Sequence, residues 1–358
     1  MNVGIVTQPL CANYGGILQN YALQQVLKRA GHTPITLDYL PSLPFGRYLL
    51  YAGKTMLCAF IPSMRHPLKP YRHFIKRAAE VEPFIHKNID LTKTIADYST
   101  KILKKYHINA VLVGSDQVWR YSWNSHYIED MYLAFAKDYP CLKIVYGASF
   151  GVENWDYPEG TTANVRELVK QFKQISVREN SAKDLCETHL GAKAITVLDP
   201  TLLLSASDYE QFCAAPNPQD PPYLAAYILD INEDKSTYIK ALAKSMNLEI
   251  KEMTVSGQEV SIEKWLTTIR NASFVITDSY HGCLFSVLFK KQFQSIINKE
   301  RGADRFVTVL SALGLQDQLL YDIKTGPVFP AAIDYTDVSL RLKNLREFSS
   351  AFLLDSIH

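Results

Sequence analysis

Short apolar segments alternate with amphipathic segments along almost the whole chain. The apolar "VGIV" leads into the periodic run "GILQNYALQQVLKRAG", and similar apolar segments return at "PITLDY", "NAVLVGSD", "KIVYGASFG" and "QISVREN". Strands separated by helices of this length are typical of βαβ units, whose strands are parallel. The alternation therefore predicts an α/β fold built on parallel sheets.

A proline-rich polar stretch, "APNPQDPPY" at residues 215–223, is the best candidate for a linker. The pattern restarts behind it with "YLAAYIL", "LEIKEMT", "SFVIT" and "QFQSIIN". We therefore expect two Rossmann-like domains that face a central cleft, an N-terminal one at 1–215 and a C-terminal one at 216–335. The first would carry an irregular helical insert at 41–108, and a final helix at 336–358 would pack back on it.

Composition limits the partners and the compartment. The 358 residues carry a formal net charge of +2, so no strong global field points to nucleic acid. The six cysteines form no CxxC pair and no zinc pattern, which is typical of free thiols in a reducing compartment. The start "MNVGIVTQPL" is interpreted as a first strand and not as a signal peptide, so we expect a cytoplasmic protein.

Parallel α/β sheets bind ligands at the carboxyl ends of their strands, and the residues at those positions are candidates for a site. Asn13, Tyr14, Gly15 and Gly16 follow the first strand. The two glycines would let backbone N–H groups approach a ligand at a helix N-terminus. The alternative is a tight loop with a glycine N-cap.

A second candidate group follows "NAVLV", where Gly114, Ser115, Asp116 and Gln117 place small and polar side chains at the strand end. Asp116 could accept a hydrogen bond from a sugar hydroxyl or act as a base. The alternative interpretation is a helix N-cap at Ser115 or Asp116.

Arg178 directly follows "QISV", where its guanidinium group suits a carboxylate or a phosphate. A salt bridge to Glu179 or to another neighbouring carboxylate is the alternative. Asp199 follows another apolar segment, but it precedes Pro200 and can bond to nearby backbone in a turn. We therefore interpret Asp199 as structural.

The stretch "TDSYHGCLFSVLF" places His281 in the first turn of a helix, immediately after a predicted strand. Asp278 or Ser279 can cap this helix. The helix dipole disfavours an imidazolium there, so His281 would act as an acid once an anionic ligand lies beside it. A histidine packed at a helix start is the alternative.

Three cations follow the strand "QFQSIIN". Lys299, Arg301 and Arg305 lie within seven residues and would suit a doubly charged small anion. A solvated basic loop is the alternative interpretation.

Taken in order, several of these motifs resemble the polysaccharide pyruvyl transferase family: "NYGGILQNYALQ", "VGSDQVW", "GASFG", "ISVREN", "LDPTLLL", "TDSYHGCLFSVLF" and "NKERGADRF". The resemblance implies a fold similar to the GT-B glycosyltransferases. It implies phosphoenolpyruvate as the donor and two hydroxyls of a sugar in a surface or capsular polysaccharide precursor as the acceptor. The products would be a cyclic pyruvate ketal and phosphate. Phosphoenolpyruvate would be a co-substrate, and we expect neither a cofactor nor a metal.

The resemblance also implies roles for single residues. Arg178 and His281 match the donor-site arginine and histidine of the family, whereas Ser279 stands where many relatives carry an arginine. Lys299, Arg301 and Arg305 are the candidates to supply that charge. We then expect His281 to be the acid and Asp116 the base, and the facing wall to be formed by Asn13, Tyr14, Gly15, Gly16 and Gln117.

The acceptor in polysaccharide assembly is often carried on a polyprenyl diphosphate at the inner membrane face. The insert combines basic and aromatic residues with the apolar "LLYAGKTMLCAFI", which would suit peripheral membrane contact. An ordinary helical excursion over the sheet is the alternative. Two other functions remain open: a nucleotide-sugar-dependent GT-B glycosyltransferase and a non-catalytic member of the scaffold.

Overall fold

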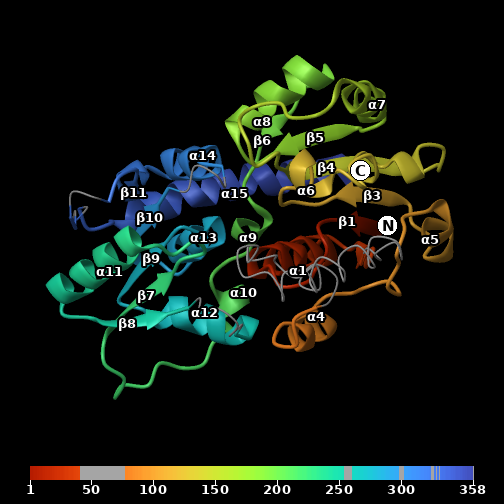
Figure 1. Ribbon diagram of the computed structural model, residues 1–358. Coiled ribbons are helices and arrows are strands. Elements are labelled where there is room, and N and C mark those ends of the chain that lie inside the picture. Colours follow the sequence, from red (N-terminus) through yellow and green to blue (C-terminus); the bar gives the residue numbers. More distant parts are fainter. Residues whose placement is uncertain are drawn as a thin grey trace, which may run out of the picture.

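The computed structural model describes residues 1–40, 77–253, 260–297, 302–323, 326–327, 329 and 331–357. These residues form two domains, each built on a parallel sheet (Figure 1). The strands of the first sheet lie in the order β2-β1-β3-β4-β5-β6, and those of the second lie in the order β11-β10-β9-β7-β8. All of these neighbouring strands pair in parallel.

The first domain follows the predicted alternation of strands and helices. Its strands are β1 (Asn2–Val6), β2 (Thr33–Thr36), β3 (Ala110–Val113), β4 (Leu142–Ala148), β5 (Gln174–Val177) and β6 (Ile195–Thr196). Its helices are α1 (Tyr14–Arg29), α4 (Glu82–Asn88), α5 (Thr100–Lys105), α6 (Tyr121–Asn124), α7 (Glu159–Val169), α8 (Asn180–Leu185), α9 (Pro200–Leu203) and α10 (Ser207–Glu210). Short 3-10 turns lie at Asp130–Tyr132 and Ala134–Ala136, and a π-helical turn at Cys186–Leu190 extends α8.

The second domain repeats the alternation. Its strands are β7 (Tyr223–Tyr227), β8 (Glu249–Glu252), β9 (Phe274–Thr277), β10 (Gln292–Ile296) and β11 (Leu319–Leu320). Its helices are α11 (Glu233–Met246), α12 (Ile262–Asn271), α13 (Tyr280–Leu288) and α14 (Asp304–Leu313), with a 3-10 turn at Gln316–Gln318. Helix α15 (Tyr335–Ile357) ends the described chain.

Alternate residues along each strand supply cores on opposite faces of the sheet. In β3, Ala110 and Leu112 belong to the core that contains α1, whereas Val111 and Val113 belong to the core on the other face. All four side chains are fully buried. Both faces of the sheet are therefore covered, and this explains why its strands are continuously apolar in sequence.

One apolar core is continuous across the two domains. It contains Ile17 and Leu18 of α1 in the first domain together with Trp265 of α12 and Phe285 of α13 in the second. Large apolar contacts between domains restrict their relative motion more than polar ones do. This core therefore fixes how the two sheets face each other.

Helix α15 returns to the first domain (Figure 1). The hydroxyl of Ser349 accepts a hydrogen bond from Leu198 N at 2.9 Å, and Ser356 Oγ donates to Gln174 Oε1 at 2.7 Å. The predicted fold class is confirmed: two Rossmann-like domains in a GT-B-like arrangement, with a C-terminal helix that packs back on the first.

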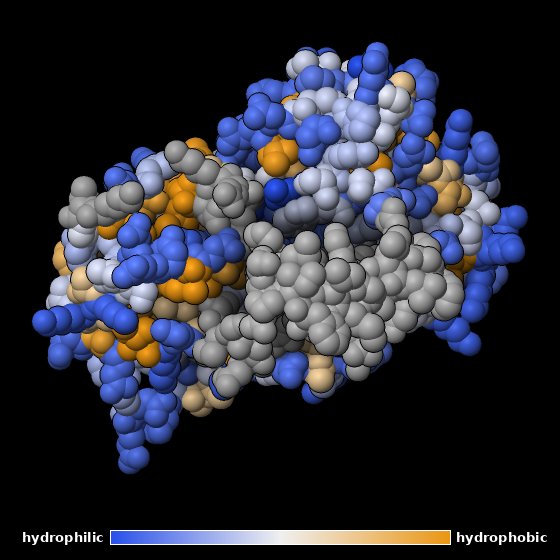
Figure 2. All heavy atoms as spheres, in the orientation of Figure 1, coloured by the Kyte–Doolittle hydropathy of each residue, from blue (hydrophilic) through white to orange (hydrophobic). Residues whose placement is uncertain are grey.

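Part of the predicted insert, residues 41–76, lies outside the described residues, while 77–108 contain the short helices α4 and α5. In the described part of the chain, no helix combines the length and the apolar character needed to cross a bilayer. Figure 2 shows a mainly hydrophilic surface over the first domain and larger apolar patches over the second. Four cysteines in the described ranges are free thiols: Cys141, Cys186, Cys213 and Cys283.

Candidate active site

Residues that follow the strands of both sheets meet at the boundary between the domains. His281, from the start of α13 in the second domain, reaches Asp199, which follows β6 in the first. The first turn of α1, which follows β1, lies against the same histidine at Gly15. The carboxyl ends of both sheets therefore contribute to one site, as expected for doubly wound domains.

His281 is held at the capped start of α13. Ser279 is the N-cap, and its hydroxyl accepts a hydrogen bond from Gly282 N at 3.4 Å. The imidazole Nε2 lies 3.6 Å from Asp199 Oδ2, and this nitrogen is buried without a hydrogen-bond partner among the described atoms. Gly15 packs on the ring, because a Cβ added to this glycine would lie 1.9 Å from Nδ1.

Asp199 is the centre of a buried polar network. Its Oδ1 accepts hydrogen bonds from Thr201 N at 3.0 Å and Thr201 Oγ1 at 2.7 Å. Its Oδ2 accepts from Gln19 Nε2 at 2.5 Å and Arg178 Nη1 at 2.7 Å. Burial acts to raise the pKa of the Asp199 carboxyl, but His281 and Arg178 more than offset burial and hold that pKa well below its usual value. Asp199 is therefore a carboxylate at neutral pH.

Arg178 joins Asp199 to a second carboxylate. Its Nη2 lies 3.4 Å from Asp116 Oδ1, and its side chain is fully buried. Burial disfavours the guanidinium charge, but Asp199 and Asp116 outweigh burial and raise the pKa of Arg178 above its usual value. The alternative interpretation of Arg178, a salt bridge to a neighbouring carboxylate, thus describes its contacts here, although its partners are Asp199 and Asp116 and not Glu179.

Asp116 is held in a costly backbone conformation. Its φ of 80° lies in the left-handed region, which non-glycine residues adopt at a cost of about 1–3 kcal/mol where their surroundings impose it. Its Oδ2 accepts a hydrogen bond from Asn13 Nδ2 at 2.7 Å, and its Oδ1 accepts from Gln117 N at 2.8 Å. No helix begins at this point, because α6 starts at Tyr121. The interpretation of Ser115 or Asp116 as a helix N-cap was wrong.

Tyr280 lies within cation–π distance of two arginines. Its ring centroid is 5.2 Å from the Arg178 guanidinium and 5.1 Å from that of Arg305. Burial, and then the charge of Arg178, lower the pKa of Arg305 to about 10. Burial raises the pKa of Glu179 despite the opposing charges of Arg178 and Arg305. The cluster therefore holds two arginines next to carboxylates in a largely buried setting.

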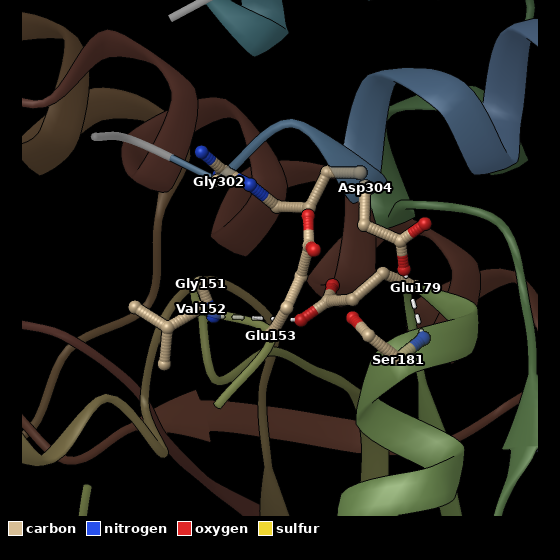
Figure 3. A pocket seen from close by; sticks show the side chains of 8 residues that line it. Gly151, Val152, Glu153, Glu179, Ser181, Gly302 and Asp304 are labelled. Atoms are coloured by element: carbon tan, nitrogen blue, oxygen red, sulfur yellow. Dashed lines mark hydrogen bonds between the residues drawn. The ribbon is translucent and has the colours of Figure 1, made fainter. Parts of the chain in front are cut away.

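A small hollow adjoins this cluster between the two domains (Figure 3). It is lined by Gly151, Val152, Glu153, Glu179, Ser181, Gly302, Asp304 and Arg305. Ser181 N donates to Asp304 Oδ2 at 2.8 Å across the boundary. A Cβ added to Gly302 would lie 2.6 Å from the carbonyl oxygen of Gly151, so the two domains are in close contact here.

The structure brings most of the predicted residues together. Asn13, Gly15, Gly16, Asp116, Arg178, Ser279 and His281 lie around Asp199, and Arg305 joins them through Tyr280. The side chain of Gln117 lies against Gly151, and its Oε1 accepts a hydrogen bond from Arg120 Nη1 at 2.8 Å. Lys299 and Arg301 fall outside the described residues.

Tyr14 has a different environment from the one predicted. Its hydroxyl donates to Val260 O and accepts from Val260 N, both at 2.9 Å, and its ring stacks on Trp265 with centroids 5.7 Å apart. Tyr14 is buried, with 8% of its surface exposed. This side chain thus forms part of the contact between the domains.

Sequence reasoning missed Asp199 and Gln19 as members of the site. Asp199 does bond to Thr201 at the start of α9, as its structural interpretation implied, but its second oxygen bonds to Arg178 and faces His281. The position of Asp199 after a strand was the available signal. Gln19 lies inside α1, and its position gave no signal of a role in the site.

Within the described residues, no cluster of three or more His, Cys, Asp or Glu side chains is placed to hold a metal ion.

Comparison with known proteins assigns a family to this chain. A profile of the family described as polysaccharide pyruvyl transferase matches residues 13–300. No curated protein matches significantly in sequence.

Solved structures with a similar shape include UDP-GlcNAc 2-epimerase from Neisseria meningitidis, with 11% identity and a TM-score of 0.49 over 100% of this chain and 99% of that one. The glycosyltransferase SnogD from Streptomyces nogalater has 12% identity and a TM-score of 0.43, and both chains are fully covered.

Proposed function

The chain belongs to the polysaccharide pyruvyl transferase family, and we propose that it transfers the enolpyruvyl group of phosphoenolpyruvate onto two hydroxyls of one sugar. The acceptor would be a precursor of a surface or capsular polysaccharide. The products would be a cyclic pyruvate ketal and phosphate. The family match carries this proposal, and the position of His281 beside an ionised carboxylate supports it with a side chain that can exchange protons.

The proposed reaction needs one acid and one base. Protonation of the methylene carbon of phosphoenolpyruvate forms a C–H bond and leaves a positive, oxocarbenium-like carbon at C2. A sugar hydroxyl attacks C2 and loses its proton, and the C2–O bond to phosphate breaks. The second hydroxyl then attacks C2 and loses its proton to the base or to the released phosphate, which closes the ketal. We assign the acid to His281 and the base, or the residue that orients the hydroxyls, to Asp116.

The donor carries a carboxylate and a phosphate, so its site requires cations. Arg305 lies beside the hollow between the domains, and Lys299 and Arg301 precede it in sequence. We propose that these residues hold the donor anions and replace the arginine that Ser279 does not supply. Arg178 is already ion-paired with Asp116 and Asp199. We therefore propose that its positive charge acts on the donor anions without direct contact.

We further propose that the acceptor is carried on a polyprenyl diphosphate and that the protein contacts the inner membrane face while it acts. The basic and aromatic residues of the insert support this proposal by their composition alone. The purified protein should bind vesicles with anionic lipid, and added salt should weaken the binding. The absence of salt-sensitive binding would contradict this part of the proposal.

Replacement of His281 by alanine tests the assigned acid. One acid–base residue contributes about 10²–10⁴-fold in rate, so His281→Ala should lower turnover by that order and leave the fold intact. Phosphate release from phosphoenolpyruvate with a panel of saccharide acceptors gives the rate, and the ketal is identified by the mass gain of the acceptor. Near-wild-type turnover in the variant would remove His281 from the mechanism.

A further inference from the structure

We infer that Asp199 is the positioning residue that sets the tautomer of His281, so that Nε2 keeps its hydrogen and Nδ1 exchanges the proton with the substrate. The tautomer follows from the position and the charge of Asp199 and does not depend on the identity of the substrate. Only the destination of the proton rests on the proposed function. Asp199 does not touch the substrate in this account, and it acts through the imidazole.

The Asp199 carboxylate faces the buried nitrogen of His281. Asp199 Oδ2 lies 3.6 Å from Nε2, and both side chains are nearly inaccessible, with 9% of His281 and 0% of Asp199 exposed. An ionised carboxylate can only accept hydrogen bonds, so the nitrogen opposite it is favoured as the one that carries a hydrogen. The distance is slightly long for a hydrogen bond, and catalytic contacts often shorten when the substrate binds.

Asp199 cannot turn away from His281 without losing other bonds. Thr201 donates twice to Oδ1, while Gln19 and Arg178 donate to Oδ2. These donors come from α1, from α9 and from the residue that follows β5, so three segments of the chain fix the carboxylate. A residue fixed in this way can orient a catalytic ring.

Gly15 touches Nδ1 from one face of the ring, and Nδ1, unlike Nε2, is not among the buried atoms that lack a hydrogen-bond partner. A Cβ on Gly15 would lie 1.9 Å from Nδ1 and 2.3 Å from both Cγ and Cε1 of His281. An atom in the ring plane, in line with the Nδ1 lone pair, would be farther from Cγ and Cε1 than this. Gly15 therefore covers the face of the ring at Nδ1 and does not lie in the direction of its lone pair.

The arrangement lets one nitrogen serve both proton transfers. The imidazolium gives its Nδ1 proton to the methylene carbon: the N–H bond breaks, the C–H bond forms, and Nε2 keeps its hydrogen toward Asp199. The remaining neutral ring has a lone pair on Nδ1, which can take the proton of the first attacking hydroxyl. Asp116 then orients the second hydroxyl or takes its proton. A ring with the opposite tautomer would have its free lone pair buried against a carboxylate and could not take the proton of the first hydroxyl.

Nitrogen-15 NMR of histidine-labelled protein tests the tautomer without substrate. The chain has nine histidines, and the His281 signals are those lost in His281→Gln. In neutral His281 we expect the wild type to carry its hydrogen on Nε2. The preference should decrease in Asp199→Asn, which keeps the shape but removes the charge. Asp116→Asn is the matched control, because Asp116 is the other carboxylate that pairs with Arg178 but is not paired with the His281 imidazole. This variant should leave the His281 tautomer unchanged.

The wild-type spectrum alone can overturn the inference, whether or not the variant folds. A neutral His281 with its hydrogen on Nδ1, or an even mixture, would contradict it. In turnover, Asp199→Asn should lower kcat by about 10²–10⁴-fold and change KM for phosphoenolpyruvate little. If the wild type transfers no pyruvyl group, the proposed function fails while the tautomer result still stands.

Discussion

At the residue scale, the position of Gly15 has no room for a side chain, because a residue of the other domain packs against it. The sequence suggested that this glycine would let the backbone approach a ligand. In the structure the imidazole of His281 occupies the space that a Cβ would need. The two residues are far apart in the chain, so no local pattern could predict their contact.

The substitution Gly15→Ala should therefore displace His281. A methyl group cannot fit 1.9 Å from Nδ1, and a displacement of about 1 Å at a catalytic group can cost on the order of 10²-fold in rate. We expect kcat/KM to fall by that order. Gly160→Ala in α7 is the matched control, because a Cβ there meets no atom within 4 Å, and it should leave activity unchanged. Wild-type activity in Gly15→Ala would contradict this packing.

The ionised Asp199 should make stability depend on pH. Its pKa in the folded protein lies below the unfolded value, which is about 3.9 for aspartate. The contribution is therefore fully present above that value and is lost as the pH falls toward the folded pKa. Urea unfolding at pH 7 and pH 3 should show a larger loss of unfolding free energy for the wild type than for Asp199→Asn. Equal losses would show that Asp199 is not the group responsible.

At the element scale, hydrophobic periodicity predicted the regular part of the fold. The periodic run "GILQNYALQQVLKRAG" corresponds to α1, Tyr14–Arg29, and the helix expected to hold His281 in its first turn is Tyr280–Leu288. Helix α9 was not predicted, because its four residues, Pro200–Leu203, are too few to show a hydrophobic period. Thr201 in this turn donates two hydrogen bonds to the Asp199 carboxylate and so orients it toward the site. The predicted bond of Asp199 to nearby backbone is confirmed at Thr201 N, but its contacts with Gln19 and Arg178 were not predicted because these partners come from distant elements.

The start of α1 and the start of α12 are joined by Tyr14, and Tyr14→Phe tests this contact. The variant keeps the stacked ring but leaves Val260 N and Val260 O without their hydroxyl partner. Loss of a hydrogen bond between partly buried groups costs about 0.5–1.5 kcal/mol. We expect a lower Tm and faster hydrogen exchange at Val260. Unchanged stability would show that this contact between the domains is weak.

At the scale of the whole molecule, the apolar core shared by both domains should make them unfold together. Trp119 is buried in the first domain on the outer face of its sheet, whereas Trp265 is buried in the shared core. Two single-tryptophan variants that each retain one of these residues should give the same denaturant midpoint by fluorescence. Separate midpoints would indicate two independent folding units and a boundary that opens easily.

The central claim is that the two domains form one site for phosphoenolpyruvate. Calorimetric titration tests it most directly, because it needs no knowledge of the acceptor. We predict that phosphoenolpyruvate binds with one molecule per chain, that His281→Ala retains this binding, and that Arg305→Gln weakens it. No heat with phosphoenolpyruvate, together with saturable binding of a UDP-sugar, would contradict the claim.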